Sequence, residues 1–175
     1  PTLSNISAYP RLWRWLRKLS PHLMRSHCRN LARADLYFLL RYGLHRPDSE
    51  RPWVHARCCD VQASPDGHLD LWAREHYKST IITFAKTIQD ILRSHGDDPL
   101  DPRECTVGIF AHSRPAAKKF LRQIKFEFET NLLLREWFPD VVWENCQRDA
   151  PKWSEDEGLV LKRRSNTKEA TVEAW

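Results

Sequence analysis

The chain has 175 residues and a mass of 20.7 kDa, which is enough for one ordinary domain with a real hydrophobic core. Its formal net charge of +5 mildly favours a polyanionic partner. No apolar run approaches the roughly 18–20 residues that a membrane span requires, so we expect no membrane partner. Residues 12–19 contain Arg14, Arg17 and Lys18, which excludes a signal peptide there, and the missing initiator methionine predicts a piece of a longer protein.

The cysteine content predicts reduced thiols. The five cysteines are odd in number and form no C-x-x-C pair, which is typical of a cytosolic protein and not of a disulfide framework. Cys28 lies near His22 and His27, but no second ligand pair accompanies them, so we expect no zinc site. The sequence also lacks G-x-S-x-G and any local signature of nucleophilic catalysis.

Residues 1–52 are predicted to form a basic helical arm. Residues 11–51 carry ten cationic side chains and three acidic ones. Apolar spacing predicts a short helix within residues 12–19 and a second helix over residues 31–42, closed by Gly43. The arm either contacts nucleic-acid phosphates or an acidic partner subunit, or is an amphipathic helical pair whose arginines only solvate one face. The second interpretation is favoured, because the arm has no Gly/Arg repeats.

A second domain is predicted over residues 53–175. Residues 45–51 are polar and contain proline, which is typical of a linker. A helix over residues 53–62 and a Ser-Pro-Asp-Gly turn lead into a strand predicted over residues 68–72. Gln62 is either a surface residue or a base-sensing glutamine, and the surface interpretation is favoured.

Lys78, Ser79 and Thr80 stand where this strand would pass into a helix. Backbone N–H groups and the positive end of a helix dipole collect at such a joint. A lysine there adds a cation for the β/γ-phosphates of ATP, and the next hydroxyl can ligate Mg²⁺. In the phosphate-loop pattern G-x-x-x-x-G-K-[ST], the two glycine positions correspond to Trp72 and Tyr77 in this chain. Neither residue is glycine, so the pattern is incomplete. The alternative is a capped, solvated helix N-terminus.

The segment after this loop is predicted to be an amphipathic helix that ends before Gly96. Its apolar residues recur at helical spacing: Ile81, Ile82, Phe84, Ala85, Ile88, Ile91 and Leu92. Strand, loop and helix therefore follow one another in the order of a phosphate-binding loop.

The C-terminal half predicts further strands and one long helix. Residues 105–111 are β-branched and apolar, which indicates a buried strand, and a helix follows from Ser113 to Trp137. This alternation of strand and helix favours a parallel α/β sheet. Three strand-like pieces complete the chain, of which the last two form a hairpin or adjacent strands: residues 152–154, 158–162 and 170–175.

Four segments carry a family resemblance: residues 72–81, 108–113 with the helix that follows, 162–165 and 168–173. Through them the chain resembles the ATPase portion of the large terminase subunit of tailed bacteriophages. The resemblance implies an α/β fold with a partial P-loop NTPase sheet of the ASCE type, flanked by helices and preceded by the basic arm. It implies a motor that hydrolyses ATP to translocate double-stranded DNA into a procapsid. The implied partners are a portal ring and a small terminase subunit. The chain would form an oligomeric ring when active, and it would lie in the host cytoplasm and transiently at the procapsid portal.

The resemblance also implies the roles of single residues. Lys78 would contact the β/γ-phosphates, Ser79 would hold Mg²⁺, and Thr80 would support the phosphates from the helix start. Arg74 resembles the family's loop arginine, which reaches the γ-phosphate and stabilises the transition state; the alternative is a surface arginine paired with Glu75. The complete ATP-binding loop would comprise Trp72, Ala73, Arg74, Glu75, His76, Tyr77, Lys78, Ser79 and Thr80, with Arg74 and Lys78 catalytic and Ser79 at the metal.

The sequence departs from the family in two respects. No apolar run ends in paired acids, as a Walker B strand would, and no acidic cluster offers the two-metal chemistry of a nuclease. In the family the Walker B strand follows the region that matches residues 172–175, so it would lie downstream. The alternatives are a helicase-like nucleic-acid motor and a non-catalytic module that holds DNA or a portal-like ring.

We expect the 175-residue chain to hydrolyse ATP slowly or not at all, because the water-activating carboxylate would lie downstream. Phosphate release can be compared between this chain and one extended at its C-terminus. Equal and robust turnover by both would contradict this expectation.

Overall fold

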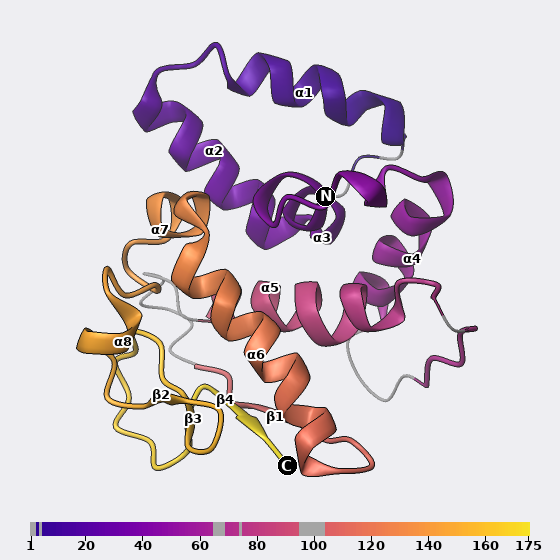
Figure 1. The fold of residues 1–175 in the computed structure, drawn as a ribbon. Coiled ribbons are helices and arrows are strands. Elements are labelled where there is room, and N and C mark those ends of the chain that lie inside the picture. The colour runs from indigo at the N-terminus through magenta and orange to yellow at the C-terminus, as the bar shows by residue number, and fades with distance from the viewer. Residues whose placement is uncertain (1–2, 4, 65–68, 74, 95–103) are drawn as a thin grey trace. The chain divides into compact units, whose positions relative to one another are not determined.

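The computed structural model of the chain describes residues 3, 5–64, 69–73, 75–94 and 104–175. Within these ranges it has eight α-helices and a small four-stranded mixed sheet, so the predicted α/β class is confirmed (Figure 1). The chain divides into two compact units, residues 1–89 and 90–175. The boundary predicted after residue 52 separates a basic arm from an ATPase domain by function, whereas these units are separated by their contacts, so that boundary stays a prediction.

The regular elements described in the first unit are helical. Proline begins α2 and α4, and the residue before it is extended in each case, as expected where proline sets the first helical φ angle. The α-helices are α1 (Tyr9–Leu16), α2 (Pro21–Ala34), α3 (Leu36–Phe38), α4 (Pro52–Ala63) and the beginning of α5 (Thr87–Ser94). The other elements are the 3-10 helices η1 (Ile6–Ala8) and η3 (Pro47–Ser49) and the π-helices η2 (Leu39–Gly43) and η4 (Thr80–Lys86). Helix α4 confirms the helix predicted over residues 53–62.

Asp35 interrupts the helix that was predicted over residues 31–42. Its backbone is extended, and its Oδ1 accepts the Phe38 N–H at 2.9 Å, so α2 ends and α3 begins there. Aspartate is more favourable at the N-terminal cap of a helix than in its interior. The spacing of apolar residues does not reveal this preference. Gln62 completes the junction, since its Oε1 accepts the Leu36 N–H at 2.8 Å and its Nε2 donates to the last carbonyl of α2. Gln62 therefore has a structural role.

The fully buried Asp35 is hydrogen-bonded to one member of an aromatic cluster. Its Oδ2 accepts the hydroxyl of Tyr9 at 2.6 Å, and the Tyr9 ring packs edge-on against Tyr37 and His55, with centroids 4.8 and 5.6 Å away. Such edge-to-face pairs add to the free energy gained by burial. Burial raises the pKa of Tyr9, and the bond to the Asp35 carboxylate raises it further. Burial likewise raises the pKa of Tyr37.

The segment predicted as a linker, residues 45–51, is packed into the first unit. Ser49 is fully buried, and its hydroxyl donates to the Arg46 carbonyl at 2.6 Å. Glu50 forms an ion pair of 2.9 Å with Arg41. The linker prediction is therefore wrong: the polar side chains that suggested it form a stabilised 3-10 turn.

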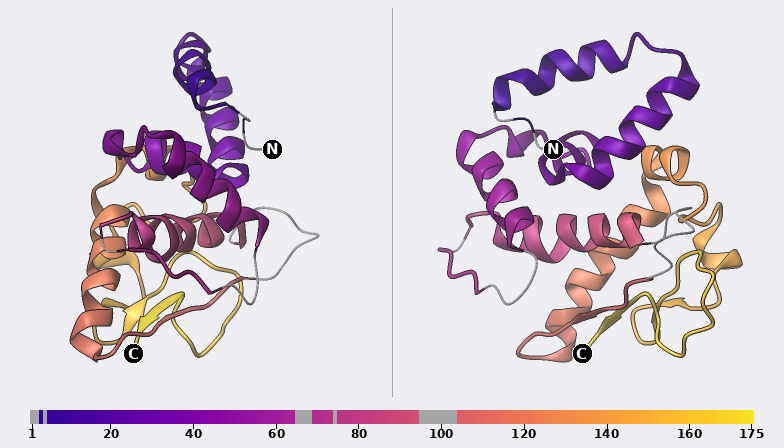
Figure 2. Two further views of the ribbon diagram at one scale, coloured as in Figure 1. Left: turned by 90° about the vertical axis from the view of Figure 1, so that its right-hand side faces the viewer. Right: turned by 180° about the vertical axis from the view of Figure 1, so that it is seen from behind.

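The second unit contains the sheet, whose strand order is β1-β4-β3-β2. Strand β1 pairs in parallel with β4, whereas β3 is antiparallel to both of its neighbours. Figure 2 shows the ribbon from two further sides, with the C-terminal segments in orange and yellow. The strands are β1 (Val107–Ile109), β2 (Trp153–Ser154), β3 (Gly158–Leu159) and β4 (Val172–Ala174). The strand predicted at residues 152–154 is confirmed by β2. The two strands predicted at residues 158–162 and 170–175 are confirmed by the neighbouring β3 and β4. The prediction of a parallel sheet is wrong except for β1 and β4, and Phe110, within the strand predicted to be buried, is 78% exposed.

Asn131 divides the helix predicted from Ser113 to Trp137 into α6 (Arg114–Thr130) and α7 (Leu132–Trp137). Its backbone is extended, and its side chain accepts the Leu134 N–H at 3.1 Å. Before this break, α6 buries one side chain per turn: Ala117, Leu121, Ile124 and Phe128.

Glu129 joins α6 to the segments around α8 (Cys146–Asp149) and β2. Its Oε1 accepts hydrogen bonds from Lys125 (2.8 Å), Trp153 (2.9 Å) and Gln147 (3.2 Å). Burial by itself raises the pKa of Glu129, but the three hydrogen bonds outweigh burial, and the net pKa is lowered. This carboxylate is therefore committed to structure.

We expect the free energy of unfolding to fall as the pH rises above about 10, where an unfolded tyrosine ionises. The raised pKa of Tyr9 means that the folded state keeps a proton that the unfolded chain loses, so each pH unit removes up to about 1.4 kcal/mol. Tyr9→Phe keeps the ring and should flatten this dependence. Urea unfolding between pH 8 and 11 measures it, and an unchanged slope in the variant would contradict the assignment.

Candidate functional site

None of the described residues that precede the predicted phosphate loop forms a strand. Residues 69–72 are irregular, and Leu69 and Leu71 are 79% and 84% exposed. The strand predicted over residues 68–72 is therefore wrong for its described part, and His68 lies outside the described residues. Alternating leucines predict one apolar face, but a strand also needs a neighbouring strand, and the described part of the first unit contains none.

The loop has two residues with left-handed backbone conformations, Glu75 (φ 65°) and Tyr77 (φ 61°). This conformation costs about 1–2 kcal/mol for a residue with a Cβ atom and is rare for a bulky side chain. Tyr77 occupies the position that the phosphate-loop pattern gives to its second glycine, the residue type that adopts positive φ freely. The backbone at this position therefore has a conformation typical of glycine, although the residue is tyrosine.

Two contacts hold Tyr77 in this conformation. Its hydroxyl donates a hydrogen bond to the Asp48 carboxylate, and its ring packs edge-on against Trp53, with centroids 5.7 Å apart. The hydrogen bond to Asp48 raises the pKa of Tyr77, with a smaller contribution from burial. Left-handed non-glycine residues persist where the surrounding structure over-determines them, and they cluster at functional sites.

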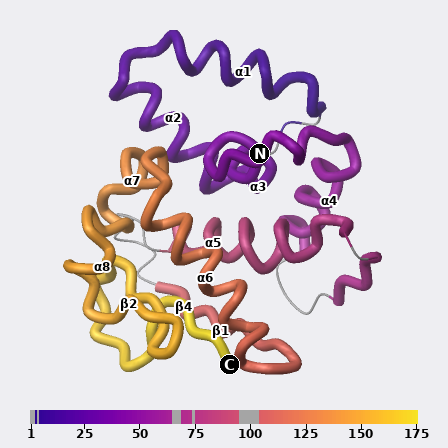
Figure 3. Tube along the Cα trace, viewed as in Figure 1, coloured from indigo at the N-terminus to yellow at the C-terminus, as the bar shows by residue number. Residues whose placement is uncertain are grey.

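A helix begins directly after Tyr77. Lys78 and Ser79 are helical, and the Ile81 N–H donates to the Tyr77 carbonyl at 2.8 Å. The N–H groups of residues 78–80 precede this hydrogen bond, so they belong to the first turn, whose donors have no acceptor within the helix. The positive end of the helix dipole lies at the same place. Figure 3 shows the chain coiling continuously from this point through η4 into α5.

Lys78 extends this positive end with an exposed ammonium group. Within the described ranges, no hydrogen bond or ion pair joins Lys78 to another side chain. Ser79 and Thr80 are half-buried, and η4 anchors the helix by burying Ile81, Phe84 and Ala85. A cation and free backbone donors thus lie together at a fixed helix start.

The remaining residues of the predicted ATP-binding loop differ in their exposure and contacts. Arg74 lies outside the described residues, so neither its proposed role nor its pairing with Glu75 is decided. Ala73 and Glu75 are exposed, whereas the Trp72 ring lies under the Arg57 guanidinium, 5.3 Å from its centroid. Ser79 is the single predicted metal ligand, and the described residues contain no group of three or more His, Cys, Asp or Glu that could hold a metal ion.

Sequence reasoning missed Asp48 and Trp53 as parts of this site. Asp48 lies 29 residues before Tyr77, in the segment predicted as a linker, and Trp53 begins a helix predicted for its own apolar pattern. No spacing connects either residue with the loop. One signal was available in the sequence. The phosphate-loop pattern places a tyrosine where glycine would supply positive φ, so another residue must hold that tyrosine in this conformation.

The basic arm presents a cluster of cations on α1 and on the two residues that follow this helix. Four exposed side chains lie around Trp15, which is itself 48% exposed, and line a shallow hollow of about 500 Å³: Arg11, Arg14, Arg17 and Lys18. Tyr9 and Leu16 form the buried side of the helix. The helix is amphipathic as predicted, and what its cations contact stays a prediction.

No family model matches the chain, and neither the curated proteins nor the solved structures contain a match. None of the helices formed by the described residues is long and apolar enough to cross a membrane.

We expect Tyr77→Gly to be more stable than Tyr77→Ala by about 1–2 kcal/mol, because only glycine adopts positive φ without strain. Ala56, exposed within α4, provides the matched control, since Ala56→Gly should lose about 1 kcal/mol. Denaturant unfolding of the three variants measures both differences. Equal stabilities at position 77 would mean that the left-handed conformation is not maintained.

Proposed function

We propose that the chain is the ATP-binding part of a DNA-packaging motor of the terminase large-subunit type, with the triphosphate bound at residues 77–80. The observation that carries this proposal is the left-handed Tyr77 immediately before Lys78 at a helix start. Glycine adopts positive φ freely, and Tyr77 has positive φ at the position that corresponds to the second glycine of the phosphate-loop pattern, which supports the proposal.

The chemistry of the helix start fits a polyphosphate. The first-turn N–H groups and the helix dipole favour an anion, and the exposed Lys78 adds a full positive charge. The half-buried hydroxyl of Ser79 follows the lysine, as in loops where this hydroxyl ligates Mg²⁺. When bound, Mg²⁺ would neutralise phosphate charge.

In the proposed mechanism each residue keeps the role that the resemblance implies. Lys78 would contact the β/γ-phosphates, Ser79 would hold the metal, and Thr80 would support the phosphates from the first turn. Arg74 stabilises the charge that develops on the transferring phosphoryl group. Hydrolysis would drive double-stranded DNA into a procapsid, with a portal ring and a small terminase subunit as partners of an oligomeric ring in the host cytoplasm.

The irregular approach through residues 69–72 departs from a P-loop NTPase, in which a strand positions the loop. In this chain the contacts of Tyr77 with Asp48 and Trp53 take over that positioning. Tertiary packing in the first unit thereby gives the loop a fixed shape at its junction with the helix.

A second candidate function is a non-catalytic module that binds DNA phosphates through α1 and the two residues that follow it. The four exposed cations around Trp15 favour this function, because cationic side chains that neutralise DNA phosphates release the counterions bound there. The affinity for DNA would therefore fall steeply as the salt concentration rises. DNA binding through α1 would survive the loss of Lys78, which separates this function from nucleotide binding.

We expect Mg²⁺-ATP to raise the melting temperature of the chain, because a ligand of the folded state at 100 times its Kd adds about 2.7 kcal/mol. Lys78→Ala should abolish the shift. Lys119→Ala, which removes an exposed lysine from α6, is the matched control and should keep it. If the unaltered chain shows no shift in millimolar nucleotide, the ATP-binding proposal fails and the DNA-binding module is favoured.

A further inference from the structure

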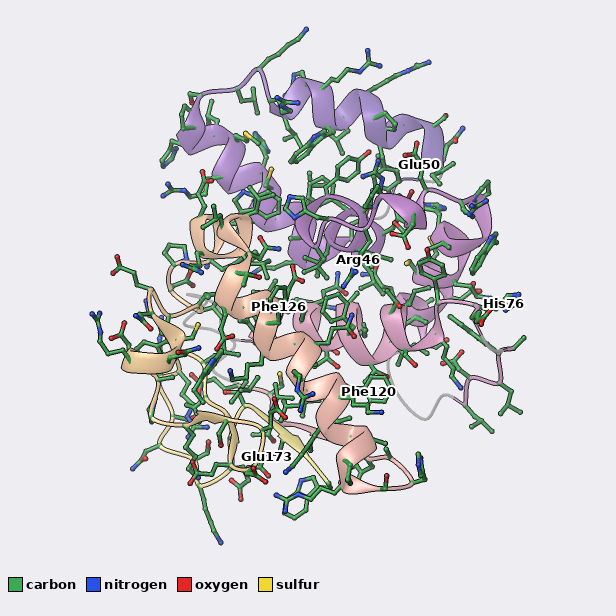
Figure 4. All side chains as sticks on the ribbon, viewed as in Figure 1. Arg46, Glu50, His76, Phe120, Phe126 and Glu173 are labelled. Atoms are coloured by element: carbon green, nitrogen blue, oxygen red, sulfur yellow. The ribbon has the colours of Figure 1, made fainter. Side chains whose placement is uncertain are left out.

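An aromatic cavity lies beside the proposed phosphate loop. Its volume of about 460 Å³ falls within the range of about 300–1,000 Å³ that is typical of small-molecule sites. Residues from α4 and from the loop line it: Trp53, Arg57, Leu71, Trp72, Ala73 and His76. Figure 4 shows His76 on the loop that follows α4.

Flat side chains form most of the cavity wall. Trp53 and Arg57 are one helical turn apart on α4 and therefore share a face. The Arg57 guanidinium lies over the Trp72 ring, while the Trp53 ring lies 5.8 Å from the His76 ring, tilted by 49°. Two indoles, an imidazole and a guanidinium thus line one space. Each of them can stack on a heterocycle.

We propose that this cavity holds the base of the nucleotide whose phosphates bind at Lys78, an inference that rests on the proposed function. Ala73 and His76 belong to the same loop as Lys78, and His76 is only two residues before it, so one nucleotide can reach both places. Two residues of extended chain span at most about 7 Å.

The composition of the wall favours a base over other ligands. Among the described residues that line the cavity there is no carboxylate, so these residues offer no anionic partner for a cationic ligand. The Arg57 guanidinium in the described part of the wall is already stacked on Trp72 and ion-paired with Asp60 at 3.2 Å. Leu71 is 84% exposed at the cavity, and a stacked base would cover part of its apolar surface.

The test compares the affinities of ATP and of inorganic triphosphate, which has the phosphates but no base. The 175-residue chain should bind Mg²⁺-ATP more tightly than triphosphate. Trp72→Ala should weaken ATP binding about 5- to 150-fold, the usual effect of removing one stacking ring, and leave triphosphate binding unchanged. Lys78→Ala should weaken both. Trp175→Ala, which removes the exposed C-terminal tryptophan, is the matched control and should change neither.

Trp53→Ala provides a second variant with its own signature. Trp53 also contacts Tyr77, so its removal should weaken ATP binding by at least as much as Trp72→Ala and can lower triphosphate binding as well.

The possible failures are distinguishable. If triphosphate binds but ATP binds no more tightly, or if Trp72→Ala leaves ATP binding unchanged, the base site is overturned while the phosphate loop stands. If neither ligand binds, the proposed function fails, and the base site fails with it.

Discussion

The hydrogen bond from the Tyr77 hydroxyl to the Asp48 carboxylate is the constraint on which the loop depends. It fixes a bulky residue in a backbone region that glycine normally occupies, at the residue before the helix start. Asp48 is itself held in η3, where the Ser49 hydroxyl donates to the Arg46 carbonyl. The loop conformation is thus a property of tertiary structure in this chain, whereas a glycine-rich loop has it through residue type.

Much of the secondary structure could be predicted, because long apolar repeats are local signals. Helix α4, the helix after Lys78 and the last two strands follow from side-chain spacing alone. Asp35 and Asn131 mark the main failures of this reasoning among the helices. Both residues lie within apolar repeats that continue past them, yet each accepts an N–H three residues onward and so competes with the helical hydrogen bonds.

The candidate site was predictable only in its local part. A lysine followed by two hydroxyls before an amphipathic segment predicts a helix start, and Lys78 lies at one. The strand at residues 68–72 was mispredicted because alternation describes one strand, whereas stability requires a second strand beside it. Asp48, Trp53 and Arg57 could not be assigned to the site, since contacts between distant segments leave no periodic trace in the sequence.

The π-helix η4 has a geometric consequence for the direction of the Lys78 side chain. A π-helical turn contains more chain than an α-helical turn, and each α-helical residue advances the direction of its side chain by about 100° around the axis. The angle around the helix axis between the Lys78 side chain and the buried Ile88 side chain therefore depends on the extra residues that the π-helical turns contain. Shortening this stretch by one residue would turn the Lys78 side chain by about 100° around the helix axis relative to Ile88.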